Sequence, residues 1–172
     1  MNGAATPAAT IARWAEAVVP GTTVLDLAAG GGRHTQLLLA RGCRVTAVDR
    51  DTTELRRIAN ARLEVVDADL EGSPWPLGDR TFGIVLVTNY LWRPLFWALR
   101  GAVAPGGELW YETFAVGHER FGRPSNPDFL LREGELPDVF GGDFAVLEYH
   151  HGEHGAPATA IRQRLRAQRR LG

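Results

Sequence analysis

The chain has 172 residues, 45% of them hydrophobic, so it is long enough and apolar enough to bury the core of one globular domain. Its formal net charge of −1 excludes the strong long-range attraction on which binding to nucleic acid or to anionic membranes depends. Cys43 is the only cysteine, which excludes an intramolecular disulfide and a cysteine-based metal site, and we expect no metal.

Residues 1–10 lack the basic and apolar stretches of a signal peptide. A run of about 18 apolar residues, which a transmembrane helix needs, does not occur in the sequence. We therefore expect a cytoplasmic protein without membrane contact. No pattern in the sequence predicts its oligomeric state.

The N-terminal stretch has the pattern of a helix. Apolar residues recur at helical spacing over Thr6–Val19, and Pro20-Gly21 ends the pattern, so an N-terminal helix is predicted within residues 1–20. Trp14 lies on its apolar side, where it either packs in the core or caps a ligand pocket.

A strand, a glycine turn and a helix are predicted next. Val24–Leu27 is a short apolar run that contains Asp26, Gly30–Gly32 allow unusual backbone torsions, and Thr35–Arg41 is rich in leucine. The free N–H groups of such a helix point at the turn and form a polar cradle. A dinucleotide-binding turn needs a third glycine where this chain has Thr35.

The stretch from Asp26 to Gly32 resembles motif I of the class I methyltransferases that use S-adenosylmethionine (SAM), commonly written D/E-x-G-x-G-x-G. Ala28 stands where the first glycine usually is. SAM carries an ammonium and a sulfonium, which a carboxylate attracts. The resemblance implies that SAM binds here, that S-adenosylhomocysteine (SAH) is the product, and that the cofactor contacts include Asp26, Ala28, Gly30, Gly32 and Arg33. The alternative is a tight turn without a ligand.

Asp49 closes the next predicted strand, Cys43–Val48. A doubly wound nucleotide-binding fold places an acidic residue there, where its two oxygens accept both ribose hydroxyls. Alternatively, Asp49 or Asp51 is the N-cap of a helix over residues 51–60. Arg50 is expected along the adenine edge.

Two further strands end in polar residues. Arg62–Val66 leads to Asp67 and Asp69; the resemblance implies that one of them accepts from the adenine amino group, and we favour Asp69 because Leu70 can pack on the ring. The apolar run Phe82–Val87 is typical of a central parallel strand. Thr88 and Asn89 follow it at the motif IV position, beside the methyl donor, without the two prolines of the amino-methylating nucleic-acid enzymes.

The remaining pattern completes an α/β fold. The order of elements predicts a Rossmann-like three-layer α/β/α sandwich in a single domain, residues 1–172. The resemblance implies a mostly parallel seven-stranded sheet whose last strand is antiparallel. The later elements are a helix over 94–103, a strand over Glu108–Phe114, a short helix over Glu133–Phe140 broken by Pro137, and strands over Phe144–His150 and Ala158–Gln168.

Ala115–Leu131 has little periodicity, and irregular segments of this length are often functional. Because it follows the carboxyl end of a strand, we expect a lid over the acceptor site; the alternative is a flexible surface loop. Its side chains have two predicted roles. Phe121 and Phe129 wall the site, and His118, Arg120 and Arg123 hold an anionic or polar acceptor.

Two charged patterns near the C-terminus have simpler interpretations. His150–His154 resembles a metal cluster but lacks a further ligand motif, so we interpret it as a polar hairpin loop. Arg162, Arg164 and Arg166 alternate along the last strand, which indicates a solvated strand face rather than a nucleic-acid stripe.

The function that the resemblance implies is methyl transfer from SAM to a small-molecule acceptor by in-line displacement; nucleic acid is not expected as a partner. Tyr90, Glu112 and His118 are the candidate bases, although Tyr90 equally suits wall packing and Glu112 an ion pair with an arginine. Phe129–Leu131 and Gly134–Leu136 also resemble the tellurite-resistance type of small-molecule methyltransferase. The alternatives are a non-catalytic SAM- or nucleotide-binding domain and a nicotinamide-dependent Rossmann enzyme.

Overall fold

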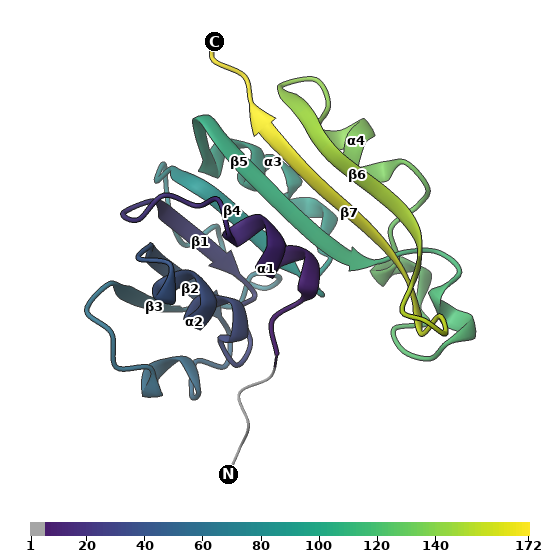
Figure 1. Cartoon of the computed structure of the whole chain (residues 1–172), viewed down its shortest axis with the longest axis horizontal. Helices are drawn as coiled ribbons and strands as arrows, with labels where there is room; N and C mark the ends of the chain where they lie inside the picture. The colour runs from purple at the N-terminus through teal and green to yellow at the C-terminus, as the bar shows by residue number, and fades with distance from the viewer. Residues whose placement is uncertain (1–5) are drawn as a thin grey trace.

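The computed structural model describes residues 6–172, which form one seven-stranded sheet with helices on both faces (Figure 1). The strands lie in the order β3-β2-β1-β4-β5-β7-β6, and β7 is antiparallel to both of its neighbours. This confirms the predicted α/β/α sandwich with an antiparallel last strand. The strands are β1 (Thr23–Leu27), β2 (Arg44–Asp49), β3 (Leu63–Asp67), β4 (Phe82–Thr88), β5 (Val103–Phe114), β6 (Phe144–His154) and β7 (Ala160–Arg169).

The central strands end together at one edge of the sheet. β1 and β4 are largely buried on both faces, as strands covered by helices on either side must be. In their parallel register Leu27 lies beside Val48 of β2 and Val87 of β4, and Asp49 lies beside Asp67 of β3. The residues that follow these strands therefore meet at a single carboxyl edge.

Within residues 6–172, four α-helices cover the two faces of the sheet. Figure 1 shows α1 (Ala9–Ala15) and α2 (Arg33–Ala40) on one face, and α3 (Phe96–Ala102) and α4 (Glu135–Phe140) on the other. On the first face Trp14 packs on Trp110, with ring centroids 5.7 Å apart. Within residues 6–172, none of the helices has both the length and the hydropathy that a membrane crossing requires.

The N-terminal helix is shorter than predicted, and residues 1–5 of the predicted stretch lie outside the described part of the chain. Ala8 has an extended conformation, with ψ of 133°, and its N–H donates to the ring of His34 at 3.1 Å. The chain therefore contacts the first turn of α2 before α1 begins at Ala9. Trp14 is a core residue of this helix, as one of its two interpretations proposed.

The alternative interpretation of this stretch, a helix over residues 51–60, is wrong, because only the 3₁₀ turn Leu55–Arg57 forms. The Asp49 carboxylate accepts from Asp51 N–H, and the Asp51 carboxylate accepts from Thr53 N–H. Such side-chain bonds compete with helical hydrogen bonds at the start of a segment.

The predicted break at Pro137 is also wrong, because α4 runs without interruption from Glu135 to Phe140. Pro137 lies in the first turn, where a backbone N–H has no partner within the helix, so the missing donor costs little.

The C-terminal hairpin corrects two predictions. Strand β6 extends to His154, which pairs with Ala160 of β7, so residues 150–154 form strand and not a loop. The predicted solvated arginine face is covered by α1 and by acidic residues of β5 and β6. The side chains of Arg162 and Arg164 are only 13% and 18% exposed, and Arg164 Nη1 donates to Thr10 Oγ1 of α1 at 3.1 Å.

Candidate functional site

The glycine turn is tied to the end of β2 by a carboxylate. Gly30 N–H donates to Asp49 Oδ2 at 2.7 Å, so the turn after β1 and the end of the neighbouring strand form one unit. Ala28, Gly30 and Gly32 have φ of 53°, 55° and 80°, in the left-handed region that favours glycine. The alanine that replaces the first motif glycine therefore adopts the conformation a glycine would take.

Two cavities flank this unit at the carboxyl edge. One, of about 240 Å³, lies between the ends of β2, β3 and β4. The other, of about 990 Å³, lies in front of the glycine turn. Together they bring nine predicted cofactor-binding residues to one place: Ala28, Gly30, Arg33, Asp49, Arg50, Asp69, Leu70, Thr88 and Asn89.

Asp26 and Gly32, also predicted to bind the cofactor, do not line either cavity. A Cβ at Gly32 would lie 2.9 Å from methyl groups of Leu55 and Ile58, so this glycine allows close packing behind the turn. The Asp26 side chain lies beneath the turn and is 1% exposed. It accepts a hydrogen bond from Thr35 Oγ1 at 2.6 Å, and burial raises its pKa from 3.8 to about 6.

We expect Asp26→Asn to stabilise the protein at alkaline pH. Because the folded state raises the pKa of Asp26 to about 6, it binds the proton more tightly than the unfolded state does, and stability falls as pH rises from 3.8 to about 6. Asparagine can still accept from Thr35 but has no charge to bury. Denaturant titrations should show a gain of about 2–3 kcal/mol at pH 8 that disappears near pH 4. A gain of equal size at both pH values would contradict the charge explanation.

His34, absent from our predicted site residues, connects three parts of the site. Ala8 N–H donates to its Nε2 at 3.1 Å, so the ring proton is on Nδ1, which donates to Thr88 Oγ1 at 3.2 Å. Burial and the nearby Arg33 lower the pKa of His34 to about 4 and keep the ring neutral. Because the folded state disfavours protonation of His34, the stability of the protein falls as pH is lowered from about 6.5 to 4. This loss is the same in wild type and in the Asp26→Asn variant, so it does not alter the difference between them. The only sequence signal was its place in the first turn after the glycines.

A third cavity, of about 260 Å³, lies beyond Tyr90. Tyr90 lines this cavity and also the one between β2, β3 and β4, so its side chain separates the two. Burial and the neighbouring carboxylate of Glu71 raise the pKa of Tyr90, so the phenol stays protonated. Tyr111 Oη donates to the carbonyl oxygen of Tyr90 at 2.9 Å and holds its backbone. The placement suits wall packing better than proton abstraction.

Glu112, the second candidate base, lies in an ion-pair cluster and not in a cavity wall. Its side chain is 3% exposed and lies 3.5 Å from Arg162 Nη1 and 3.5 Å from Arg164 Nε. Arg162 Nη1 also donates to Asn89 Oδ1 at 2.7 Å. The structure thus brings Glu112 together with two arginines, as the ion-pair interpretation proposed.

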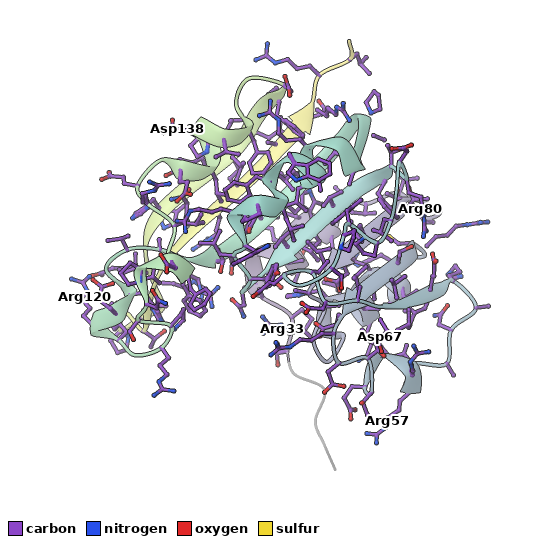
Figure 2. The ribbon with its side chains drawn as sticks, turned by 180° about the vertical axis from the view of Figure 1, so that it is seen from behind. Arg33, Arg57, Asp67, Arg80, Arg120 and Asp138 are labelled. Carbon is purple, nitrogen blue, oxygen red and sulfur yellow. The ribbon has the colours of Figure 1, made fainter. Side chains whose placement is uncertain are left out.

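His118, the third candidate base, is packed inside the 115–131 segment. Its Nε2–H donates to the carbonyl oxygen of Arg123 at 3.0 Å, and the centroid of its ring lies 4.3 Å from the ring centroid of Phe114. Arg120 pairs with Glu153 at 3.2 Å, and Figure 2 shows it at the outer end of the segment, far from Arg33. None of His118, Arg120 and Arg123 lines the third cavity.

The 115–131 segment is fastened at both ends. Ala115 and Leu131 form a parallel bridge, and both residues are buried. Arg93 Nη1 and Nη2 donate to the carbonyl oxygens of Asp128 and Leu130 at 2.8 and 2.9 Å. Phe129 lines the third cavity, as predicted for a wall residue, whereas Phe121 does not.

Comparisons with known proteins agree with this arrangement. Residues 24–107 match the family model of the methyltransferase domain. A stretch of 51 residues is 49% identical to the ribosomal RNA small subunit methyltransferase H of Gemmatimonas aurantiaca, which is 30% of this chain and 15% of that protein. The chain thus spans a small part of that curated relative.

Solved structures share the whole fold. TehB from Haemophilus influenzae has a TM-score of 0.75 at 17% identity, over 95% of this chain and 63% of that one. The 1,6-didemethyltoxoflavin-N1-methyltransferase of Burkholderia thailandensis has a TM-score of 0.67 at 20% identity, over 93% and 78% of the two chains. With the domain match over residues 24–107 and the order of the seven strands, these similarities show that the chain has the fold of the SAM-dependent methyltransferases.

Proposed function

We propose that the protein transfers a methyl group from SAM to a small-molecule acceptor by in-line displacement. The observation that carries this proposal is the contact between Gly30 N–H and the Asp49 carboxylate, at 2.7 Å. It joins the glycine turn to the acidic end of β2 at the mouth of two cavities. The smaller cavity, between the ends of β2, β3 and β4, suits the adenosine of the cofactor. The larger cavity, in front of the glycine turn, suits its amino-acid part.

The charge of the smaller cavity favours SAM over a nicotinamide dinucleotide. Its walls carry the carboxylates of Asp49, Asp69 and Glu71 but only one guanidinium, that of Arg50. Such a site repels a pyrophosphate and attracts a sulfonium or an ammonium. The similar structure of the 1,6-didemethyltoxoflavin-N1-methyltransferase contains bound S-adenosylhomocysteine, which supports the same choice.

The residues present fit the parts of this cofactor. Each oxygen of Asp49 already accepts one backbone N–H, from Gly30 or Asp51, and keeps further acceptor capacity for a ribose hydroxyl. Asp69 and Leu70 line the same cavity and would hold the edge and the face of the adenine.

Arg33, Thr88 and Asn89 line the larger cavity and would hold the amino-acid end. When bound, SAM supplies the electrophilic methyl group. The work of the chain is then to orient the two reactants and to exclude water between them.

We expect SAM and SAH, and not NAD, to bind in calorimetry and to raise the melting temperature. Asp49→Ala should weaken both ligands by roughly ten- to a hundredfold, because charge-assisted bonds of about 1.5–3 kcal/mol are lost. The Gly30 N–H also loses its acceptor, so a modest loss of stability, about 1 kcal/mol, should accompany the change.

Asp51→Ala is the matched control, because its carboxylate only accepts from Thr53 N–H. If Asp51→Ala weakens SAH as much as Asp49→Ala does, the ribose contact is misassigned. The proposal fails if neither SAM nor SAH binds at millimolar concentration, or if NAD binds more tightly. A labelled-methyl assay with candidate acceptors separates an enzyme from a domain that only binds.

A further inference from the structure

The cavity beyond Tyr90 is placed to receive the methyl acceptor. Glu71 and Tyr90 line both this cavity of about 260 Å³ and the smaller cofactor cavity, so the two spaces share a wall. A molecule in the outer cavity would therefore lie next to the cofactor. The inference below rests on the proposed function and concerns the chemical class of that molecule.

Glu71 is the only charged side chain among the described residues that line the outer cavity. Its carboxylate takes part in no ion pair within residues 6–172, and the side chain is exposed to the cavity and to solvent. The rest of the wall is neutral: it includes the phenol of Tyr90, the amide of Asn89, and the rings of Phe114 and Phe129.

The cations around this cavity are already paired or lie elsewhere. Arg162 lies over the ring of Phe114, 4.2 Å from the ring centroid, and it is paired with the buried Glu112, which it shares with Arg164. Arg120 pairs with Glu153. The anion-binding role that the sequence predicted for His118, Arg120 and Arg123 therefore has no support from their positions.

We propose that the acceptor is a small amine on an apolar or aromatic body, and that Glu71 holds the amine at the wall between the two cavities. A protonated amine first gives one proton to solvent, because the attack needs a free lone pair on nitrogen. The neutral nitrogen then attacks the methyl carbon, and a nitrogen–carbon bond forms as the sulfur–carbon bond breaks. The electron pair of the broken bond goes to sulfur, which becomes a neutral sulfide. The positive charge moves to nitrogen, and the methylammonium then gives its proton to solvent.

A carboxylate beside the nitrogen is suited to this charge movement. Glu71 stabilises the charge that develops on nitrogen in the transition state. The aromatic faces of Phe114, Phe129 and Tyr90 are favourable surroundings for a cation as well. A carboxylic acid acceptor would instead bring a second negative charge next to Glu71.

The test compares amines with carboxylates of matching shape in two measurements: their binding to the SAH complex and their rate of methylation by SAM. Benzylamine and phenethylamine should bind the SAH complex in saturation-transfer NMR, whereas benzoate and phenylacetate should not. With SAM and a labelled methyl group, wild type should methylate the amines at least tenfold faster than the carboxylates. Glu71→Gln should lower amine turnover ten- to a hundredfold and Glu71→Asp should restore part of it.

The control is Asp79→Asn, an exposed residue that does not line any of the three cavities. It should leave amine binding and turnover within twofold of wild type. The inference is overturned if SAH binds but no amine binds its complex, if carboxylates react as fast as amines, or if Glu71→Gln has no effect. Absence of SAH binding would instead overturn the proposed function itself.

Discussion

Gly30→Val is expected to abolish measurable binding of SAM and SAH, with affinity at least a hundredfold below that of wild type. Gly30 has φ of 55°, and no described atom lies within 4 Å of the position where its Cβ would be. A side chain there would meet no protein and would extend into the cavity of about 990 Å³ that Gly30 lines. Calorimetry with SAH measures the loss.

Gly78→Val separates this blocking effect from backbone strain. Gly78 has φ of 54° and an equally open Cβ position, but it lies in the turn after Leu77 and lines none of the three cavities of the site. Both variants should lose about 1–2 kcal/mol of stability because a branched residue enters a left-handed conformation. Only the Gly30 variant should lose the ligand, and equal losses of affinity would show that strain alone is responsible.

Glu112→Ala is expected to lower the free energy of unfolding by about 3–5 kcal/mol, because it leaves two largely buried arginines without their counter-charge. The side chains of Arg162 and Arg164 are 13% and 18% exposed, and both approach Glu112 at 3.5 Å. Denaturant-induced unfolding at neutral pH measures the effect.

Glu153→Ala is the comparison for an exposed pair. Glu153 and Arg120 lie 3.2 Å apart with side chains 64% and 60% exposed, and removing such a contact should cost less than about 1 kcal/mol. If Glu112→Ala keeps wild-type stability and SAH affinity but loses turnover, Glu112 acts on the acceptor as a base and its structural assignment is wrong.

The strands and the glycine turn were predictable because local pattern decides them. Phe82–Thr88 is buried on both faces, so its uninterrupted apolar run marks it as a central strand wherever its neighbours lie. The approach of Asp49 to Gly30 also follows from local rules, since parallel strands side by side bring their carboxyl ends to one edge.

The covered face of β7 was not predictable in the same way. Alternation of Arg162, Arg164 and Arg166 with other residues shows that they share a face, but it does not show what covers that face. The cover comes from Thr10 of α1 and from Glu108, Trp110 and Glu112 of β5, far away in sequence.

Glu71 was missed for a related reason. It follows Asp67 and Asp69 in a run of acidic residues. The local sequence does not distinguish an acidic residue that lines only the cofactor cavity from one that also lines the outer cavity. The outer cavity depends on Phe114, Pro124 and Phe129, which come together from β5 and the segment after it.

The position of β7 between β5 and β6 has a consequence for folding during synthesis. The ribosome makes β6 before β7, yet β6 joins the sheet only through β7. Until β7 emerges, β5 keeps an open edge, and β6 has no partner strand. Helix α1 cannot make all of its contacts before β6 and β7 are in place, because its Trp14 donates to Glu148 of β6 and its Thr10 accepts from Arg164 of β7. Helix α1 therefore completes its contacts only after the hairpin closes, and until then the nascent chain carries an unprotected strand edge.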